Sequence, residues 1–279
     1  MTGPEPVPPV RERFAAEARE ERPDLARLCL LIGAEADPAL DGAAMDEAEI
    51  ELDRLAGLLP YRPAAPLDWA RALGRLLGAE HGFHGTAADY QKLESSLLQQ
   101  VLRRRRGLPI LLSVVWMEVA RRAGAPVYGV GLPGHFVVGL GEAGGPHVLV
   151  DPYDSGRILT DADAELLVAG AAGTPFSPAM LAPADPLDTV QRVLNNIRAW
   201  AATRPEHRAV QLWSIDLALL LPRHPAKLRY ERARLLVAMG DFLGGAAELE
   251  DYAELIATFD PPSAQVLRAE ARAARANLN

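Results

Sequence analysis

The stretch RRGLPILLSVVWMEVARRAGAPVYGVGLPGHFVVG at residues 105–139, followed by VLVDPYDSG at residues 148–156, decides the fold. Its first part repeats apolar side chains at helical spacing, and Pro109 suits the first turn because its missing N–H would be unpaired there. Three short β-type runs follow, separated by Gly and Pro clusters: residues 127–130, 135–138 and 147–150. We therefore expect a helix over residues 110–123 and a small antiparallel sheet packed against it.

His135 begins the second of these runs, and Asp151 follows the third. Neighbouring strands lie about 4.8 Å apart, so a hydrogen bond between the two side chains is feasible. In a nucleophile–base–orienter triad, such an aspartate orients the imidazole and raises its pKa. The third member would lie at the start of the helix, where the dipole lowers the pKa of a thiol. A purely structural role stays open for both residues. His135 would then be a residue at the start of a strand whose hydrogen-bonding groups are satisfied, and Asp151 would cap a turn.

The flanking sequence is mostly helical. Helical patterns occupy the N-terminal part to about residue 59, then residues 67–77, with a stop at Gly78, and residues 93–105, while residues 61–66 form a loop. From Pro186 onward we expect helices at residues 187–202, 208–221, 226–239 and 243–259 and after Pro262. The fold class expected is α+β, in three parts: a flexible tail at 1–10, a mixed domain at 11–183 and a helical domain at 184–279.

Four motifs resemble the SirB-type family of transglutaminase-like proteins: GFHGTAADY (82–90), RRGLPILLSVVWMEVARRAG (105–124), GVGLPGHFVV (129–138) and DPYDSG (151–156). The run VQRVLNNIRAW (190–200) resembles the start of that family's tetratricopeptide-like tail. The resemblance covers most of residues 20–255 and implies a transglutaminase-like, papain-like core with a C-terminal helical-repeat tail. It also implies that His135 and Asp151 occupy the base and orienter positions.

The sequence departs from the family's active members at the nucleophile. In those members a cysteine follows a glycine at the helix start, whereas here the matching residues are Gly107, Leu108 and Pro109. We therefore expect a pseudoenzyme, a non-catalytic interaction or regulatory protein that binds a protein or peptide partner. The partner would contact the C-terminal helices, whose type commonly presents a concave groove, or the cleft of the core.

The rival hypothesis is a cysteine-less hydrolase or acyltransferase that uses His135 and Asp151 with Ser113 or water as the nucleophile. Ser113 lies one helical turn after Pro109, although a serine in an apolar helix usually bonds its own i−4 carbonyl. Cys29 lies in an apolar helix, where cysteines mostly act as small hydrophobes. The spacing of His81, His84 and Asp89 is a weak metal signal, and we expect no metal and no cofactor.

Composition excludes several classes of function. The formal net charge is −8, which disfavours binding to nucleic acid or to anionic membranes. No stretch approaches the about 18 apolar residues that a membrane span needs, and the N-terminus lacks a signal-peptide core. The single cysteine excludes an internal disulfide and suits a cytoplasmic location. The abundance of Ala, Arg and Leu suggests a bacterial source.

Overall fold

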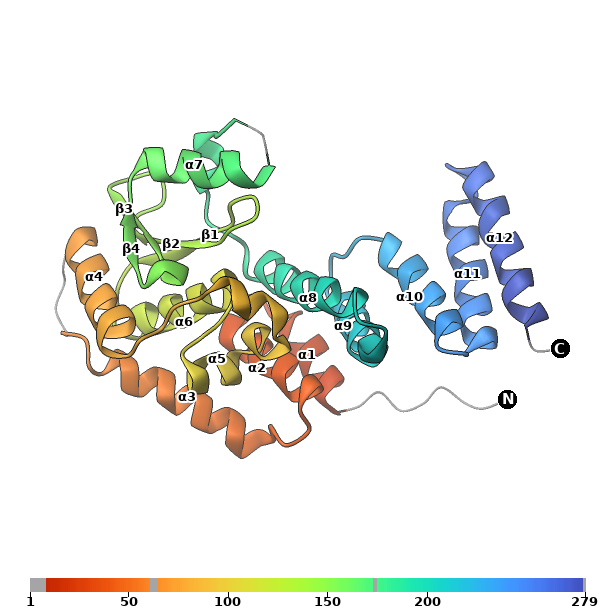
Figure 1. The fold of residues 1–279 in the computed structure, drawn as a ribbon, viewed down its shortest axis with the longest axis horizontal. Helices are drawn as coiled ribbons and strands as arrows, with labels where there is room; N and C mark the ends of the chain where they lie inside the picture. The colour runs from red at the N-terminus through yellow and green to blue at the C-terminus, as the bar shows by residue number, and fades with distance from the viewer. Residues whose placement is uncertain (1–8, 61–64, 173–174, 278–279) are drawn as a thin grey trace. The chain divides into compact units, whose positions relative to one another are not determined.

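The computed structural model describes residues 9–60, 65–172 and 175–277 (Figure 1). The chain divides into two compact units, which we call the core unit (residues 20–193) and the helical unit (residues 9–19 and 194–277 of the described chain). Residues 9–19 thus belong with the C-terminal helices, whereas the sequence led us to place residues 11–183 in one domain. Of the tail expected at residues 1–10, residues 1–8 lie outside the described part.

Helix α6 (Pro109–Arg122) forms the centre of the core unit, and Trp116 within it is fully buried. A four-stranded sheet follows, with the order β1-β2-β3-β4 and antiparallel pairing throughout: β1 (Val127–Val130), β2 (Val137–Gly141), β3 (His147–Asp151) and β4 (Arg157–Leu159). The α+β class with a small antiparallel sheet is therefore confirmed. The short fourth strand was not predicted, because only three residues after a turn carry it.

Helices cover both faces of the sheet (Figure 1). Val137 and Leu149 pack against Val168 of α7 (Asp161–Ala172), a helix that the sequence analysis did not predict. Side chains alternate along a strand, so the register pair Val138 and Val150 points to the opposite face. On the other side of the sheet α6 contacts β1 and β2, and α4 (Pro66–Leu73) contacts β2 and β3. The sheet is thus a middle layer between α7 and the α4–α6 pair.

Strand β2 begins two residues later than predicted, at Val137 instead of His135. The backbone carbonyls of the preceding two residues accept hydrogen bonds from side chains. Arg192 donates to the carbonyl of His135 at 2.8 Å, and Ser113 donates to that of Phe136 at 3.2 Å. These bonds replace ladder bonds and hold His135 in a loop at the end of the sheet.

The remaining elements of the core unit are α2 (Leu25–Ala36), α3 (Gly42–Ala56), a π-helix η1 (Gly74–Glu80), the 3-10 helices η2 (Ala87–Gln91) and η3 (Leu93–Ser96), α5 (Leu98–Arg104), and the 3-10 helices η4 (Pro152–Asp154) and η5 (Pro178–Leu181). Two predicted helices need correction. The helix expected at 67–77 turns into a π-helix at Gly74 and runs past Gly78 to Glu80. The helix expected at 93–105 is α-helical only from Leu98 and ends where Arg105 adopts a left-handed conformation with φ of 57°.

The helical unit confirms the predicted helices of the C-terminal part. They are α8 (Pro186–Ala202), which begins in the core unit, then η6 (Pro205–His207), α9 (Arg208–Leu220), α10 (Lys227–Ala238), α11 (Phe242–Ile256) and α12 (Pro261–Ala276). Helix α1 (Pro9–Glu17) packs against α9, and Arg11 pairs with Asp216 at 2.8 Å. Within the parts that the structure describes, no helix combines the length and apolar character needed to cross a bilayer.

Candidate functional site

The structure brings His135 and Asp151 together at the end of the sheet. His135 lies two residues before Val137, which opposes Asp151 if the β2–β3 register is continued by one pair. Because side chains alternate along a strand, His135 and Asp151 share one side. His135 Nε2 and Asp151 Oδ2 are 2.9 Å apart, with 12% and 5% of the two side chains exposed. The hydrogen bond considered feasible from the sequence is therefore present.

Asp151 also holds the turn that follows β3. Its Oδ1 accepts a hydrogen bond from the backbone N–H of Tyr153 at 2.9 Å, which caps η4. The base–orienter reading and the turn-cap reading are thus compatible, because each carboxylate oxygen serves one of them. Among the described residues, His135 Nδ1 has no hydrogen-bond partner, so that nitrogen is the unoccupied one of the ring.

Helix α6 contacts β2 and η4, the elements that follow His135 and Asp151, and its first turn offers no thiol. Pro109 is the first residue of α6 and is buried, and the N-cap residue Leu108 gives no side-chain cap. Four residues on, Ser113 is fully buried and its hydroxyl donates to the carbonyl of Phe136. That bond fastens the helix to the residue after His135, and Ser113 makes no hydrogen bond with the imidazole itself.

Cys29 is the one cysteine of the chain and lies in the buried face of α2. Burial raises its pKa far above the usual value, and the charges of Glu118 and Asp24 raise it further. The thiol is therefore protonated at neutral pH and a poor nucleophile.

Two tyrosines that the sequence analysis did not assign to the site lie beside it. The Tyr153 ring meets the His135 ring edge-on, with centroids 6.0 Å apart, and also meets the Tyr90 ring at 6.3 Å. Burial raises the pKa of Tyr90, and the charge of Asp151 raises it further. Tyr90 is nevertheless 48% exposed, so its ring provides an accessible aromatic surface near the imidazole.

Arg192 of α8 is a further residue of the site that sequence reasoning missed. It donates to the carbonyls of Leu132 and His135 at 2.9 and 2.8 Å, and its guanidinium lies over the Phe136 ring. Burial lowers its pKa. The 132–136 loop is therefore fixed by a side chain about 60 residues away in sequence, a distance that no local pattern reveals.

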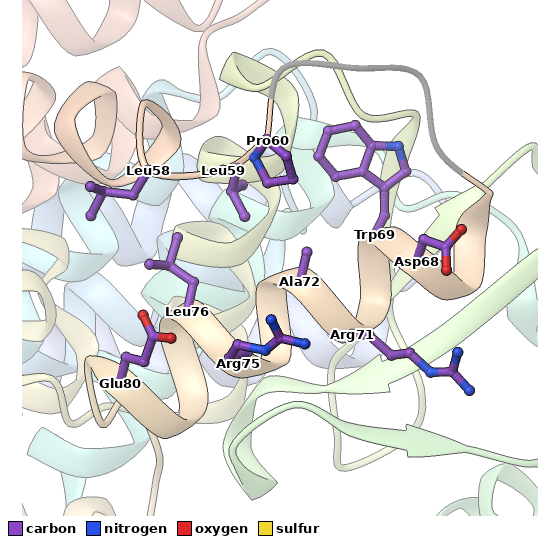
Figure 2. A pocket seen from close by; sticks show the side chains of 10 residues that line it. All are labelled: Leu58, Leu59, Pro60, Asp68, Trp69, Arg71, Ala72, Arg75, Leu76 and Glu80. Atoms are coloured by element: carbon purple, nitrogen blue, oxygen red, sulfur yellow. The ribbon is translucent and has the colours of Figure 1, made fainter.

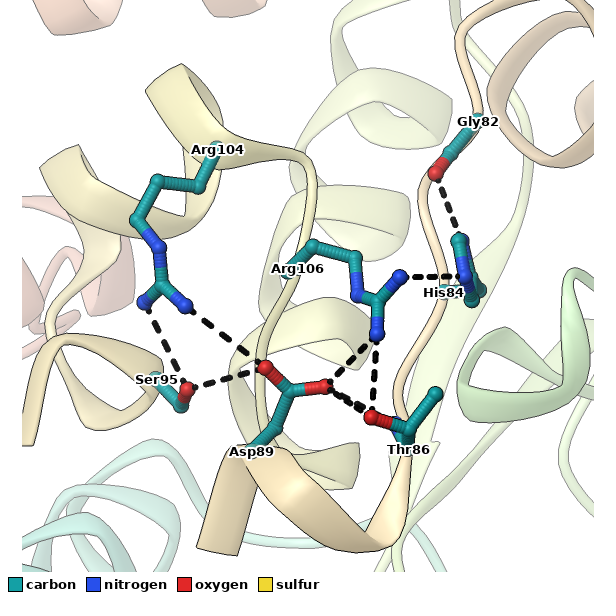
Figure 3. A network of polar contacts seen from close by, with 7 residues as sticks. All are labelled: Gly82, His84, Thr86, Asp89, Ser95, Arg104 and Arg106. Carbon is teal, nitrogen blue, oxygen red and sulfur yellow. Dashed lines mark hydrogen bonds and ion pairs between the residues drawn. The ribbon is translucent and has the colours of Figure 1, made fainter. Parts of the chain in front are cut away.

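A polar network around Asp89 fixes the loop that presents Tyr90 (Figure 3). The carboxylate of Asp89 bonds the backbone N–H and hydroxyl of Thr86 at 2.9 and 2.8 Å and pairs with Arg106 at 3.3 Å and Arg104 at 3.6 Å. Burial alone would raise the pKa of Asp89, but the bonds from Thr86 and the charge of Arg106 outweigh it and lower the pKa. Arg104 and Arg106 thus bind an acidic group of the same unit.

The two histidines of the predicted turn are engaged in the same region. His84 contacts the carbonyl of Gly82 and the guanidinium of Arg106, and His81 contacts Arg105. Across the described residues, no group of three or more His, Cys, Asp or Glu side chains has the geometry to hold a metal ion. These side chains join the 81–91 loop to the segment between α5 and α6.

Comparison with known proteins places this geometry in a family context. A family model described as the transglutaminase-like superfamily matches residues 45–195. A UPF0162 protein of Xylella fastidiosa is 31% identical over 249 residues, which cover 86% of each chain. A UPF0162 protein of Pseudomonas aeruginosa is 32% identical over 209 residues, 71% of this chain and 76% of the relative. Human F-box only protein 21 is 26% identical over 178 residues, 61% of this chain and 28% of that protein.

Proposed function

Because this chain belongs to the transglutaminase-like superfamily, we propose that it binds a protein or peptide partner and does not catalyse acyl transfer. The observation that carries the proposal is the start of α6. Pro109 occupies the first turn there, and α6 contacts β2 and η4, which adjoin the hydrogen-bonded His135–Asp151 pair. A base and an orienter without a nucleophile cannot form a covalent acyl intermediate.

The other two nucleophile candidates support the same proposal. The Ser113 hydroxyl is fully buried and donates a hydrogen bond to the carbonyl of Phe136, so its O–H is directed at that carbonyl and not at the imidazole. The Cys29 thiol is buried in α2 and kept protonated. Both side chains serve packing in the core unit.

The helical unit offers apolar side chains for a partner. Large exposed apolar residues there are Met239, Leu243, Leu255, Phe259 and Val266. A contiguous exposed apolar patch commonly marks a site of protein interaction, and we propose that some of these side chains form one. The relationship to F-box only protein 21, of which the matching part is 28%, is consistent with a domain that operates together with other protein parts.

The proposal also covers the subfamily, the type of helical repeat and the cellular location. We propose that the chain is SirB-type, that its paired C-terminal helices are tetratricopeptide-like, and that it acts in the cytoplasm. The antiparallel packing of α10, α11 and α12 around Ala246, Leu249 and Ala271 supports the repeat reading. The single reduced cysteine suits a reducing compartment.

Affinity purification with the full-length chain tests partner binding. Phe259 in the helical unit and Leu166 in the core unit are both 72% exposed, so they form a matched pair. We expect Phe259→Asp to lose proteins that the wild type retains from a lysate of the source organism, while Leu166→Asp retains them. The proposal fails if all three chains recover the same proteins, or if none exceeds a bait-free control.

One observation favours the second candidate, a hydrolase that uses water. His135 Nδ1 has no hydrogen-bond partner among the described residues, and Asp151 orients the ring, so the free nitrogen is placed as a general base for a water molecule. In that case ester or amide hydrolysis would be lost with His135→Ala and kept with Ser113→Ala. Equal background rates for the wild type and His135→Ala would remove this candidate, and loss of activity with Ser113→Ala would indicate a serine nucleophile instead.

A further inference from the structure

A cavity of about 500 Å³ lies in the core unit between α3 and α5. Four of the residues that line it are buried: Leu40, Ala48, Gln99 and Leu102. Its volume falls in the range of about 300–1,000 Å³ that small-molecule sites occupy. The cavity shares no lining residue with the His135–Asp151 pair, so it is a separate feature of the molecule.

The side-chain amide of Gln99 is the polar group among these buried residues. Gln99 is only 5% exposed, and its Oε1 and Nε2 atoms are buried without a hydrogen-bond partner among the described residues. Folded proteins satisfy nearly all buried polar groups, because an unpaired one loses its bonds to water and gains nothing in return. An unpaired amide that borders a cavity therefore points to a hydrogen-bonding group from outside the chain.

The position of Gly33 in α2 explains where the amide lies. A Cβ added at Gly33 would be 2.2 Å from Gln99 Oε1, so the glycine leaves the space that the amide occupies. The described residues give the amide no hydrogen bond there, and packing alone holds it. Rotation about the side-chain bonds of Gln99 therefore brings the amide to a ligand in the cavity that this residue lines.

Charged side chains of both signs also line the cavity: Glu47, Glu51, Arg103 and Arg105. Glu51 pairs with Arg54 at 2.6 Å, and Arg105 contacts His81. Glu47 and Arg103 are exposed, so water screens the charge of each. Two carboxylates and two guanidiniums favour neither an anion nor a cation, which leaves the amide as the group that selects the ligand.

A second cavity of the core unit shows the contrast. It has a volume of about 580 Å³ and lies between the end of α3 and the helix formed by α4 and η1 (Figure 2). Its charged side chains are two carboxylates and two guanidiniums, all of them exposed: Asp68, Glu80, Arg71 and Arg75. None of its lining residues has a buried polar side-chain atom without a partner in the described chain. The second cavity thus lacks a group comparable to the Gln99 amide.

We propose that the cavity between α3 and α5 binds a small neutral molecule that carries an amide on an apolar body, such as a lactam. A lactam presents its N–H and its carbonyl side by side, so it pairs with the Gln99 amide through two hydrogen bonds, one in each direction. The apolar body packs on Leu40, Ala48 and Leu102. This site does not depend on the proposed partner binding, because it uses other residues and another class of ligand.

Titration calorimetry of the full chain with caprolactam tests the proposal. N-methylcaprolactam and cycloheptanone are the counterparts, because both keep the ring and its carbonyl but lack the N–H. We expect caprolactam to bind about tenfold more tightly than either counterpart, the difference expected when one partner of a buried hydrogen bond is missing. In NMR spectra the side-chain amide signals of Gln99, identified by their loss in Gln99→Met, should shift when caprolactam is added.

Two glutamine variants separate the amide from the apolar contacts. Gln99→Met keeps the length of the side chain and should bind caprolactam no more tightly than cycloheptanone. It should also melt no lower than the wild type, because the chain loses no hydrogen bond. Gln100→Met is the matched control, because Gln100 is the half-buried neighbour outside the cavity lining and its loss should leave binding unchanged.

Four results would overturn the proposal. Caprolactam could show no binding at millimolar concentration, or N-methylcaprolactam could bind as tightly as caprolactam does. Gln99→Met could bind caprolactam as the wild type does. A lower melting temperature of Gln99→Met would show that the amide is bonded within the chain and is not free for a ligand.

Discussion

At the residue scale, Asp151 serves two neighbours at once, the imidazole of His135 and the N–H of Tyr153. Asp151→Ala leaves both groups without an acceptor in a buried site, so we expect a loss of about 1–3 kcal/mol in the free energy of unfolding. Urea denaturation measures it. Asp154→Ala is the control, because Asp154 is exposed and its pair with Arg157 lies at the surface. Equal stability of the two variants would show that the His135–Asp151 bond contributes nothing to folding.

His81 gives a prediction about pH. Burial, and then the charge of Arg105, lowers the pKa of His81 in the folded chain. The unfolded chain therefore takes up the proton more readily, so the stability linked to His81 is present above its usual pKa of about 6.5. It is lost as the pH falls through the lowered folded value.

Unfolding measurements at pH 7.5 and pH 5.5 check this prediction. The wild type should lose more stability across that interval than His81→Gln, because the variant has no proton to bind there. A variant whose stability falls as steeply as that of the wild type would contradict the assignment to His81.

At the element scale, Gly78 sets how closely η1 approaches the turn after β3. A Cβ at this position would lie 2.0 Å from the backbone carbonyl oxygen of Ser155, which cannot rotate away as a side chain would. We expect Gly78→Ala to destabilise the core unit by about 1–3 kcal/mol. Gly42→Ala, in α3 with open space around it, should instead be neutral or stabilising by up to about 1 kcal/mol. Thermal melts decide, and a Gly78→Ala melting temperature at or above the wild-type value would refute the close approach.

Some secondary-structure elements could be predicted from the sequence and others could not. Helix α6 and strand β1 follow from periodicity and from Pro109 and Gly124, which are local signals. The late start of β2 depends on contacts with Ser113 and Arg192, and η1 approaches Ser155 closely at Gly78; all three partners are remote in sequence. Tertiary contacts of this kind override local propensity and leave no periodic pattern.

The sequence could likewise predict some residues of the candidate site and not others. His135 and Asp151 could be paired from the order of the strands, because antiparallel neighbours place their ends together. The positions of Tyr90 and of the Asp89 network could not be predicted, because they depend on how the 81–91 loop contacts Arg104 and Arg106. The spacing of Thr86 and Asp89 matches a capping box and was the one local signal available.

At the scale of the whole molecule, the chain's first helix belongs with its last ones. Phe14 of α1 is fully buried, and α1 packs against α9. Phe14→Ala should therefore cost about 3–5 kcal/mol and act on the helical unit. Hydrogen exchange should show α9 losing protection while α6 keeps it. The exposed Glu12→Ala serves as the control, and equal loss of protection in α6 and α9 would mean that the two units unfold together.

The central claim is that a base and its orienter remain beside the start of α6 while the nucleophile is absent. Introducing Pro109→Cys and following the ultraviolet absorbance of its thiolate against pH tests this most directly, because the readout does not need a reagent to reach a buried side chain. We predict no thiolate signal from the folded wild type at neutral pH, since its only thiol is buried, and a thiolate signal from Pro109→Cys that is lost when His135→Ala is added. The same signal from Pro109→Cys with and without His135, or a thiolate signal from Cys29 in the folded wild type, would contradict the claim.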